Sequence, residues 1–491
     1  VEAISPNKII HITPMEPIYN IETLKQILNE HDEALFIKIF NTLHPQKELI
    51  HNWHIKCILH HLDAVEKGQI KRLIINMPPR SLKSICVNVY WSVKLLARNP
   101  SSKIISVSYS QELSNKHAQD VRFVMQSGWF NYCFPDALIA RGNNTKQKFL
   151  TQSRGFRFAT SVCGTLTGEG ADFIIVDDPQ TPQQVFSQKK REKINNWFDQ
   201  TLVSRLNDRA NGAIVVVSQR LHPNDLTGYL LKKGGWTVLT LPLIAPRNTK
   251  ISINNYEYKR KKNEVLNKTE FDKKTINDLK RELGHYGFMS QYQQNPQVLH
   301  SQIVKKDWFR RYSRKELESI YDKMIIYQSW DCAIKVGKNS DYTVCITIGL
   351  YNNQYYLLNV LRKKYTYPHL KNAVIQMYDT YKPVTIIIED KASGQQLIQE
   401  IQEHSSHIHI VPYNPKYDKV TRLVLITPLI ESGNVFLPGE KAAKSWLPQF
   451  EEELLLFPIA EHDDQVDAFT QLIQWLQKQK ATMNKYSLCT I

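Results

Sequence analysis

Short runs of apolar, β-branched residues alternate with longer helical stretches over most of the chain. Between residues 20 and 240 such runs predict strands at 72–77, 103–109, 172–176 and 213–218. Because strands that alternate with helices form βαβ units, we predict an α/β domain around a mostly parallel central sheet. From about residue 320 the pattern returns and predicts a second α/β domain, with strands at 324–330, 342–350, 354–361 and 384–389.

The stretch between these two regions is polar and rich in lysine. It contains Lys-Arg-Lys-Lys at 259–262 and a predicted helix at 275–283 that ends at Gly284. A chain of 491 residues exceeds the size at which one hydrophobic core keeps growing, so several domains are expected. We therefore predict an N-terminal domain at 1–243, a basic connector at 244–310 and a C-terminal domain at 311–491.

Charge and cysteine content indicate which kind of partner and which cellular compartment to expect. Lys and Arg total 63 against 47 Asp and Glu, a net charge of +16, which favours a polyanion such as nucleic acid as partner, although many soluble proteins are mildly basic. The seven cysteines are scattered without a C-x-x-C pair, which is typical of a reducing cytosol and argues against structural zinc. Since apolar runs stay shorter than a membrane span and the start lacks a signal-like segment, we expect a soluble protein that is not secreted and does not contact membranes.

Residues 73–87 read as strand, tight loop and helix. This order suits a nucleoside triphosphate, because helix N-terminal amides, a lysine and a hydroxyl can meet its phosphates and Mg²⁺. Lys83 and Ser84 occupy the positions that those roles require. However, Met77 and Leu82 stand where the phosphate-binding pattern has glycine, so the segment alone favours an ordinary turn.

A second motif about ninety residues later favours the phosphate-binding interpretation. The apolar run 172–176 ends in Asp177 and Asp178. We expect Asp177 to hold Mg²⁺ and Asp178 to orient or deprotonate the attacking water. An Asp-Asp-Pro turn is the alternative, but the combination with Lys83 and Ser84 favours ATP binding.

Three acidic clusters follow in the last third of the chain. Asp331 and Glu389 close two predicted strands, and residues 462–467 open a predicted amphipathic helix. Carboxylates are the ligands that Mg²⁺ and Mn²⁺ prefer, and two such ions about 4 Å apart can clamp the attacking and leaving oxygens at phosphorus. The candidate ligands are Asp331, Glu389, Asp463, Asp464 and Asp467.

Helical spacing orders the last three of these acids. Asp464 and Asp467 are three residues apart and share a helix face, so we favour them as ligands, with Asp463 nearer the N-cap. Capping of the helix by acidic residues is the alternative and explains one acid rather than three. For Asp341 we favour a turn over a carboxylate in the outer coordination shell.

A basic and aromatic segment at 412–422 lies between the second and third acidic clusters. Its lysines and arginine are candidates for contacts with DNA phosphates, although a solvated loop that leads into a helix fits equally well. The DNA-binding candidates are Lys391, Lys416, Lys419 and Arg422.

These motifs together resemble those of the large subunit of tailed-bacteriophage or prophage terminases, which packages viral DNA. The resemblance covers most of the chain. It rests on Pro-Pro-Arg at 78–80 before Lys83 and Ser84, and on segments 164–172, 177–179, 220–228, 291–296, 389–394 and 462–468.

The resemblance implies an N-terminal P-loop ATPase, a linker and a C-terminal nuclease with a ribonuclease H-like α/β fold. In that family Arg80, Lys83 and Ser84 would line ATP with Mg²⁺, and Arg220 could sense its γ-phosphate, an arginine in a solvated loop being the alternative. Trp53 to Lys56 are a weaker candidate for contact with adenine. An arginine acting on a neighbouring subunit could be any of Arg122, Arg154, Arg157 and Arg205.

By the same resemblance the chain would package and cut double-stranded DNA in the cytoplasm of a bacterial host, outside the mature virion. Its partners would be a terminase small subunit, a portal protein on the procapsid and further copies of itself in a ring. Two alternatives remain. A resolvase-like repair nuclease would share the acidic site, and a prophage remnant with an impaired ATPase would be compatible with Leu82.

Overall fold

The computed structural model describes residues 21–50, 52–142, 144–166, 168–297, 303–333, 342–391, 393–405, 407–439 and 444–487. By its internal contacts the chain divides into two compact units. The first comprises 1–179, 196–218 and 233–267, and the second comprises 180–195, 219–232 and 268–491. This division follows contacts within the fold, and the domain boundaries at 243 and 310 stay predictions.

The first unit is built on a mostly parallel sheet. The described residues form seven strands in the order β3-β4-β2-β5-β6-β1-β7, all paired in parallel except β3 with β4. The predicted mostly parallel α/β sheet is therefore confirmed. The strands are β1 (Arg72–Asn76), β2 (Lys103–Ser108), β3 (Lys148–Leu150), β4 (Phe156–Ser161), β5 (Phe173–Asp177), β6 (Ala213–Ser218) and β7 (Thr237–Thr240).

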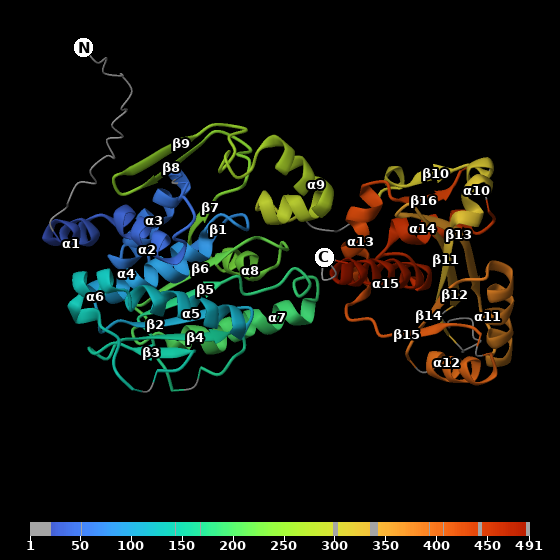
Figure 1. Ribbon diagram of the computed structural model, residues 1–491, viewed down its shortest axis with the longest axis horizontal. Coiled ribbons are helices and arrows are strands. Elements are labelled where there is room, and N and C mark those ends of the chain that lie inside the picture. Colours follow the sequence, from blue (N-terminus) through green and yellow to red (C-terminus); the bar gives the residue numbers. More distant parts are fainter. Residues whose placement is uncertain are drawn as a thin grey trace, which may run out of the picture. The chain divides into compact units, whose positions relative to one another are not determined.

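Burial explains why these strands read as continuous apolar runs in the sequence. Every residue of β6 is buried, and so are the last four residues of β1. A parallel sheet that is covered on both faces requires this pattern, because neither face meets water. Helices of the unit are α1 (Ile21–Glu30), α2 (Asp32–Leu43), α3 (Trp53–Glu66), α4 (Trp91–Arg98), α5 (Gln111–Met125) and α6 (Gly128–Cys133), with π-helical Ile85–Tyr90 before α4 (Figure 1).

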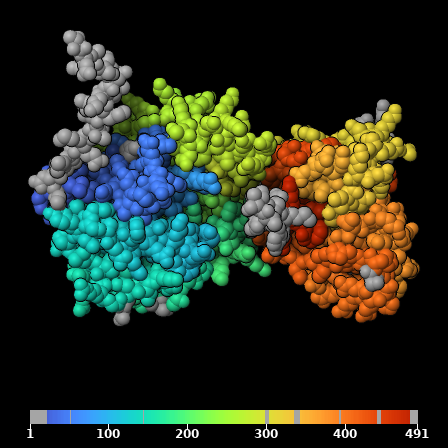
Figure 2. All heavy atoms as spheres, in the orientation of Figure 1, coloured from blue at the N-terminus to red at the C-terminus, as the bar shows by residue number. Residues whose placement is uncertain are grey.

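A two-stranded hairpin, β8 (Thr249–Ile253) and β9 (Tyr256–Arg260), forms part of the predicted connector and packs on α3. The indole of Trp53 stacks on Tyr258 with ring centroids 4.1 Å apart, and the Arg260 guanidinium lies 5.3 Å from the indole centroid. Trp53 therefore packs the hairpin against α3. This packing explains the indole better than contact with adenine does. The hairpin contributes to the yellow-green surface in Figure 2.

The second unit contains a mixed sheet with the order β10-β16-β13-β12-β11-β14-β15 in the described residues. Strands β11, β12 and β13 pair antiparallel, whereas β14 lies parallel to β11 and β15 parallel to β14. This is the predicted ribonuclease H-like arrangement. The strands are β10 (Arg310–Tyr312), β11 (Ile325–Asp331), β12 (Thr343–Tyr351), β13 (Gln354–Lys363), β14 (Thr385–Glu389), β15 (Ile410–Tyr413) and β16 (Val435–Pro438).

Helices cover both faces of this sheet (Figure 1). One apolar cluster joins β12 and β13 to α13 and α15, and another joins β11 and β14 to α11 and α12. The first turn of α15 is thereby held against the end of β11. The helices are α10 (Arg314–Ile320), α11 (Tyr367–Tyr381), α12 (Ser393–His404), α13 (Lys419–Glu431), α14 (Leu447–Leu456) and α15 (Asp464–Ser487).

Helix α9 (Lys273–Gly287) follows the predicted helix closely. The regular helix breaks at Gly284, whose φ of 65° is left-handed, and a further turn continues to Gly287. Two further helices of the described residues are α7 (Gln188–Trp197) and α8 (Leu226–Lys233). Within the described ranges, none of the helices has the length and apolar character that crossing a bilayer requires.

Candidate active sites

The loop between β1 and the following helix adopts a conformation that usually requires glycine. Arg80 has a φ of 60° and Leu82 a φ of 62°. A side chain in this left-handed region costs about 1–2 kcal/mol because Cβ crowds the following carbonyl. The loop therefore takes up its shape despite Leu82, where the phosphate-binding pattern has glycine.

Lys83 is buried and forms an ion pair with Asp178. Its Nζ lies 2.7 Å from Asp178 Oδ2, and its exposed fraction is 7%. Asp178 follows the end of β5 with a φ of 44°, and its backbone N–H donates to Val217 O at 2.9 Å. The structure thus brings together the two predicted motifs of the first domain, which lie far apart in the sequence.

Asp177 is the last residue of β5 and is fully buried. Its Oδ2 accepts a hydrogen bond from Asn88 Nδ2 at 3.0 Å, whereas its Oδ1 has no hydrogen-bond partner among the described residues. Burial raises the pKa of Asp177, and this rise is opposed by Lys83, Asn88 and Ser84. A buried carboxylate oxygen without a donor, close to a serine hydroxyl, is a donor set that fits Mg²⁺.

A buried polar network behind Asp177 was not predicted from the sequence. Asn88 Oδ1 accepts from Arg157 Nη2 at 2.8 Å and from Ser106 Oγ at 2.6 Å, and Asn88 Nδ2 lies 3.0 Å from His117 Nδ1. Burial lowers the pKa of Arg157 to about 9. Because Arg157 is fully buried, it does not suit the role of an arginine that reaches a neighbouring subunit. The single sequence signal was an asparagine inside the apolar run 85–90.

Arg220 lies in the second unit and is bound to Asp225. Its Nε lies 3.0 Å from Asp225 Oδ2, and the same carboxylate accepts from the backbone N–H groups of Leu221 and Gly228. The Arg220 N–H donates to Gln294 Oε1 at 2.9 Å. Two motifs of the terminase resemblance, 220–228 and 291–296, therefore contact each other. A role of Arg220 at ATP stays a prediction.

The second unit gathers the acids that were predicted to bind metal. Asp331 ends β11 and Glu389 ends β14, and since Trp330 pairs with Ile388 in parallel register, both acids leave the sheet at the same edge. Asp464 and Asp467 lie in the first turn of α15 and are buried. Burial, with the negative charges of Asp467, Glu389 and Asp464, raises the pKa of Asp331 well above its ordinary value.

Basic side chains hold several of these acids. Lys419 Nζ lies 2.6 Å from Asp463 Oδ1 and 2.7 Å from Asp467 Oδ2. Arg422 Nη2 lies 2.5 Å from Asp467 Oδ1, and Lys391 pairs with Glu389. No group of three or more His, Cys, Asp and Glu side chains in the described part of the chain is arranged so that it could hold an ion as it stands.

Comparisons with known proteins agree with this geometry. A family model described as the terminase RNaseH-like domain matches residues 328–475. Residues 328–475, which include strands β12 to β16 of the second sheet, are therefore similar to this terminase domain. No curated protein matches the sequence.

Solved structures extend the likeness to the fold of the whole chain. The large terminase of a thermophilic bacteriophage matches with a TM-score of 0.52 and 9% identity over 86% of this chain and 98% of that one. The same terminase in complex with ADP matches with a TM-score of 0.50 and 11% identity over 85% and 98%. The chain therefore has the fold of a phage large terminase, with the mostly parallel sheet in its first unit and the ribonuclease H-like sheet in its second.

The predicted DNA-binding residues differ in how far their side chains are exposed to solvent. Lys416 is exposed, and the side chain of Lys391 is 67% exposed. Arg422 is buried at 4% exposure and faces Asp467, which favours a role inside the protein over contact with DNA phosphates. Lys419 is intermediate in exposure and contacts acids. Asp341 lies outside the described residues.

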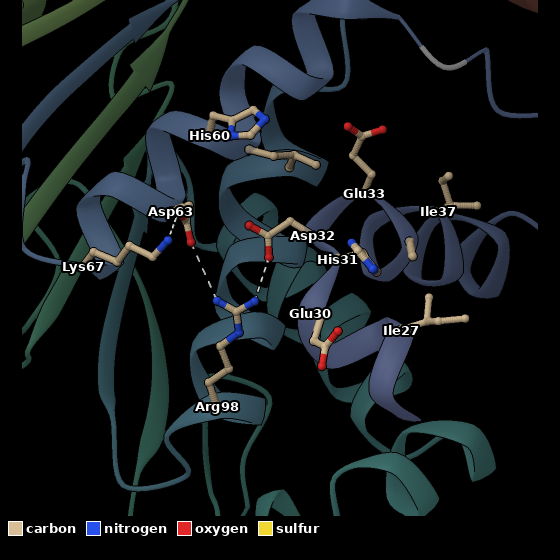
Figure 3. Close-up of a pocket in the computed structure, with 12 residues that line it drawn as sticks. Ile27, Glu30, His31, Asp32, Glu33, Ile37, His60, Asp63, Lys67 and Arg98 are labelled. Carbon is tan, nitrogen blue, oxygen red and sulfur yellow. Dashed lines mark hydrogen bonds and ion pairs between the residues drawn. The ribbon is translucent and has the colours of Figure 1, made fainter. Parts of the chain in front are cut away.

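The first unit of this terminase-like chain also has a pocket of about 650 Å³ between α1, α2 and α3. Figure 3 shows Arg98 between Asp32 and Asp63, with Glu30 and Glu33 nearby. Its lining contains none of the predicted site residues. Beneath it Lys94 is fully buried, with Nζ 2.8 Å from Asp32 and 2.9 Å from Glu66. This ion network explains the charged lining as part of the helix packing.

Proposed function

We propose that the chain is the large subunit of a phage DNA-packaging terminase, which couples ATP hydrolysis to the movement of double-stranded DNA into procapsids and cuts concatemeric DNA. The fold and the terminase RNaseH-like family support this proposal. The observation that carries the cutting function is the convergence of Asp331, Glu389 and the first turn of α15 at one edge of the second sheet.

In the first unit Arg80 and Lys83 would bind the phosphates of ATP, while Ser84 and Asp177 would hold its Mg²⁺. A solved large terminase with ADP supports nucleotide binding at this fold. Because Lys83 now pairs with Asp178, a triphosphate that attracts Lys83 would release the Asp178 carboxylate. The released carboxylate could then orient or deprotonate the attacking water.

In the second unit Asp331, Glu389, Asp464 and Asp467 are the proposed ligands of Mg²⁺ or Mn²⁺, with Asp463 beside them. Divalent ions in such a site activate water and stabilise the leaving 3′ oxygen. Burial and the negative charges of the neighbouring acids raise the pKa of Asp331, and a bound cation would offset that repulsion, so the donor set fits the ion chemically. Contact of Lys391, Lys416 and Lys419 with DNA phosphates completes the proposed nuclease, which would grip DNA of any sequence.

The proposed partners follow from the packaging function. They are a terminase small subunit, a portal protein on the procapsid and further copies of the chain in a ring, in the cytoplasm of a bacterial host. Arg220 would belong to the segment that couples hydrolysis to movement. Gln294 holds its backbone N–H, and Asp225 holds its side chain.

Two single substitutions test the two activities against each other. Asp331→Asn should lower Mn²⁺-dependent plasmid cleavage by about a thousandfold and leave DNA-stimulated ATP hydrolysis unchanged. Lys83→Ala should lower ATP hydrolysis by about 10²- to 10³-fold and leave plasmid cleavage unchanged. Equal ATPase rates in Lys83→Ala and the unaltered chain would favour the ATPase-impaired remnant. Cleavage without any packaging of DNA by procapsids would favour a repair nuclease.

A further inference from the structure

Three consecutive basic residues at the end of β13 were not predicted to belong to the acidic site. They are Arg362, Lys363 and Lys364. In the register of the sheet Asp331 pairs with Val344, and Val344 pairs with Arg362. Because neighbouring strands lie about 4.8 Å apart, the backbones of Asp331 and Arg362 are separated by about 10 Å at one edge of the sheet. The basic residues therefore lie beside the acids.

Lys364 is connected to an acid of α15 through one tyrosine. Its Nζ lies 4.7 Å from the centroid of the Tyr342 ring, and the Arg362 guanidinium lies 3.7 Å from the same centroid. The backbone N–H of Tyr342 donates to Asp464 Oδ2 at 3.1 Å. Since the tyrosine that contacts both cations also binds Asp464, the position of Lys364 relative to this acid is fixed.

Arg362 supports this arrangement from inside the protein. Its side chain is 10% exposed, and its Nε lies 3.9 Å from Glu453 Oε2. Glu453 Oε1 accepts the backbone N–H groups of Gln465 at 2.7 Å and of Val466 at 3.2 Å. Arg362 thereby ties the end of β13 to the first turn of α15. A phosphate outside the protein would meet the two lysines that follow it.

Lys363 is the more exposed of these two lysines. Its Nζ lies 5.6 Å from the Tyr365 ring centroid, and no acid of the described residues lies within ion-pair distance of it. A cation above an aromatic ring at an exposed site is held by only about 0.5–1 kcal/mol, so a phosphate can displace the ring. By contrast, Lys391 and Lys419 are paired with acids.

A further lysine lies on the other side of the acids. Lys416 is exposed and follows β15, whose Tyr413 pairs with Glu389 of β14. In the strand order β13-β12-β11-β14-β15 the acids of β11 and β14 therefore lie between two basic positions. Four strand spacings amount to about 19 Å. At about 3.4 Å a step, this length corresponds to about five to six base pairs of a duplex.

We propose that duplex DNA lies across the strand ends of the second sheet, and that Lys363 and Lys364 bind its phosphates on the side of the acids opposite Lys416. The inference rests on the proposed nuclease function and adds the surface and the direction in which its substrate lies. The charge of the two lysines complements the phosphates, and contacts of this kind are independent of base sequence. The acids then face a segment of DNA that is held on both sides.

The salt dependence of DNA binding tests the proposal. Fluorescence anisotropy of a labelled duplex is measured on the full chain without nucleotide, in EDTA so that no DNA is cut. Replacing Lys363 and Lys364 together by alanine should reduce the slope of log affinity against log salt by about 1.8, which is about 0.9 for each phosphate contact. Adding Lys416→Ala should remove about 0.9 more, because contacts with separate phosphates add.

A pair of lysines at the opposite edge of the same sheet provides the matched control. Lys323 precedes β11 and Lys382 precedes β14, and both are exposed. Replacing these two by alanine removes the same charge and should leave the slope unchanged. Arginine at both 363 and 364 keeps the charge and should also leave it unchanged. Lys363→Ala alone, at an exposed position, should reduce the slope by about 0.9 and serves if the double variant does not fold.

The outcomes separate the DNA surface from the function on which it rests. If a folded variant without Lys363 and Lys364 keeps the slope of the unaltered chain, or loses no more than the control pair, then the proposed surface is wrong and the nuclease proposal stands. If the unaltered chain binds no duplex DNA, the proposed function is wrong as well. Thermal unfolding shows which variants are folded.

Discussion

The two candidate sites use the same kind of ion pair for different purposes. Lys83 binds Asp178 and Lys419 binds Asp467, each at 2.7 Å. The first lysine is nearly buried and faces an acid that would act only after the lysine moves to a phosphate. The second lies between two acids, and its side chain is 44% exposed. The burial of the lysine, rather than the distance to its partner, thus distinguishes the two pairs.

A third lysine serves as a reference, because no catalytic role is proposed for it. Lys94 is fully buried among Asp32, Asp63 and Glu66. Lys94→Met should lower the free energy of unfolding by about 3 kcal/mol, since three partly buried acids lose the buried cation among them and keep only Arg98 as a shared partner. Urea denaturation measures this change.

Lys67 offers the matched control. It pairs with Asp63 at 2.7 Å, but its side chain is 58% exposed, so Lys67→Met should cost less than about 1 kcal/mol. Equal losses in the two variants would show that burial does not set the strength of these pairs. The distinction drawn between Lys83 and Lys419 would then lose its basis.

Substitutions at Leu82 test the conformation of the loop that carries Lys83. Both Leu82→Gly and Leu82→Ala remove the isopropyl group beyond Cβ, but only alanine keeps Cβ and with it the cost of a left-handed φ. The glycine variant should therefore be more stable than the alanine variant by about 1 kcal/mol, measured by chemical denaturation. Equal stabilities would mean that the loop does not hold residue 82 in this conformation.

The smallest expected effect concerns DNA binding beside the nuclease site. Lys416 is exposed, and its replacement by alanine should reduce the slope of log affinity against log salt by about 0.9, the value for one phosphate contact. Arg422→Ala should instead lower stability, because its partner Asp467 is buried. Fluorescence anisotropy at several salt concentrations measures the slope. If the slope fell in Arg422→Ala and stayed unchanged in Lys416→Ala, then Arg422 rather than Lys416 would be the residue that contacts phosphate.

Much of the fold was predictable because its elements are regular. The apolar runs that predicted strands at 72–77 and 213–218 became β1 and β6, and the acids at the ends of β11 and β14 met because parallel strands end at one edge. Short strands such as β10 and β16 carry too few residues to show a period.

Side-chain partners were harder to predict. Lys419 and Arg422 read as a basic surface, yet the helix that carries them turns both toward acids that lie more than forty residues away. The left-handed conformation of Leu82 depends on how the loop closes between strand and helix, and residue type alone argues against it. The buried asparagine at 88 has four partners from other elements, so no local pattern could identify them.

The fully buried guanidinium of Arg157 has a consequence for the acid at the end of β5. It lies close enough to Asp177 to offset the charge of that acid inside the protein, with Asn88 bonded to both. The interior beneath the phosphate loop is therefore electrically balanced before any nucleotide arrives. Under the proposed function, strand β5 would therefore receive a nucleotide without rearrangement.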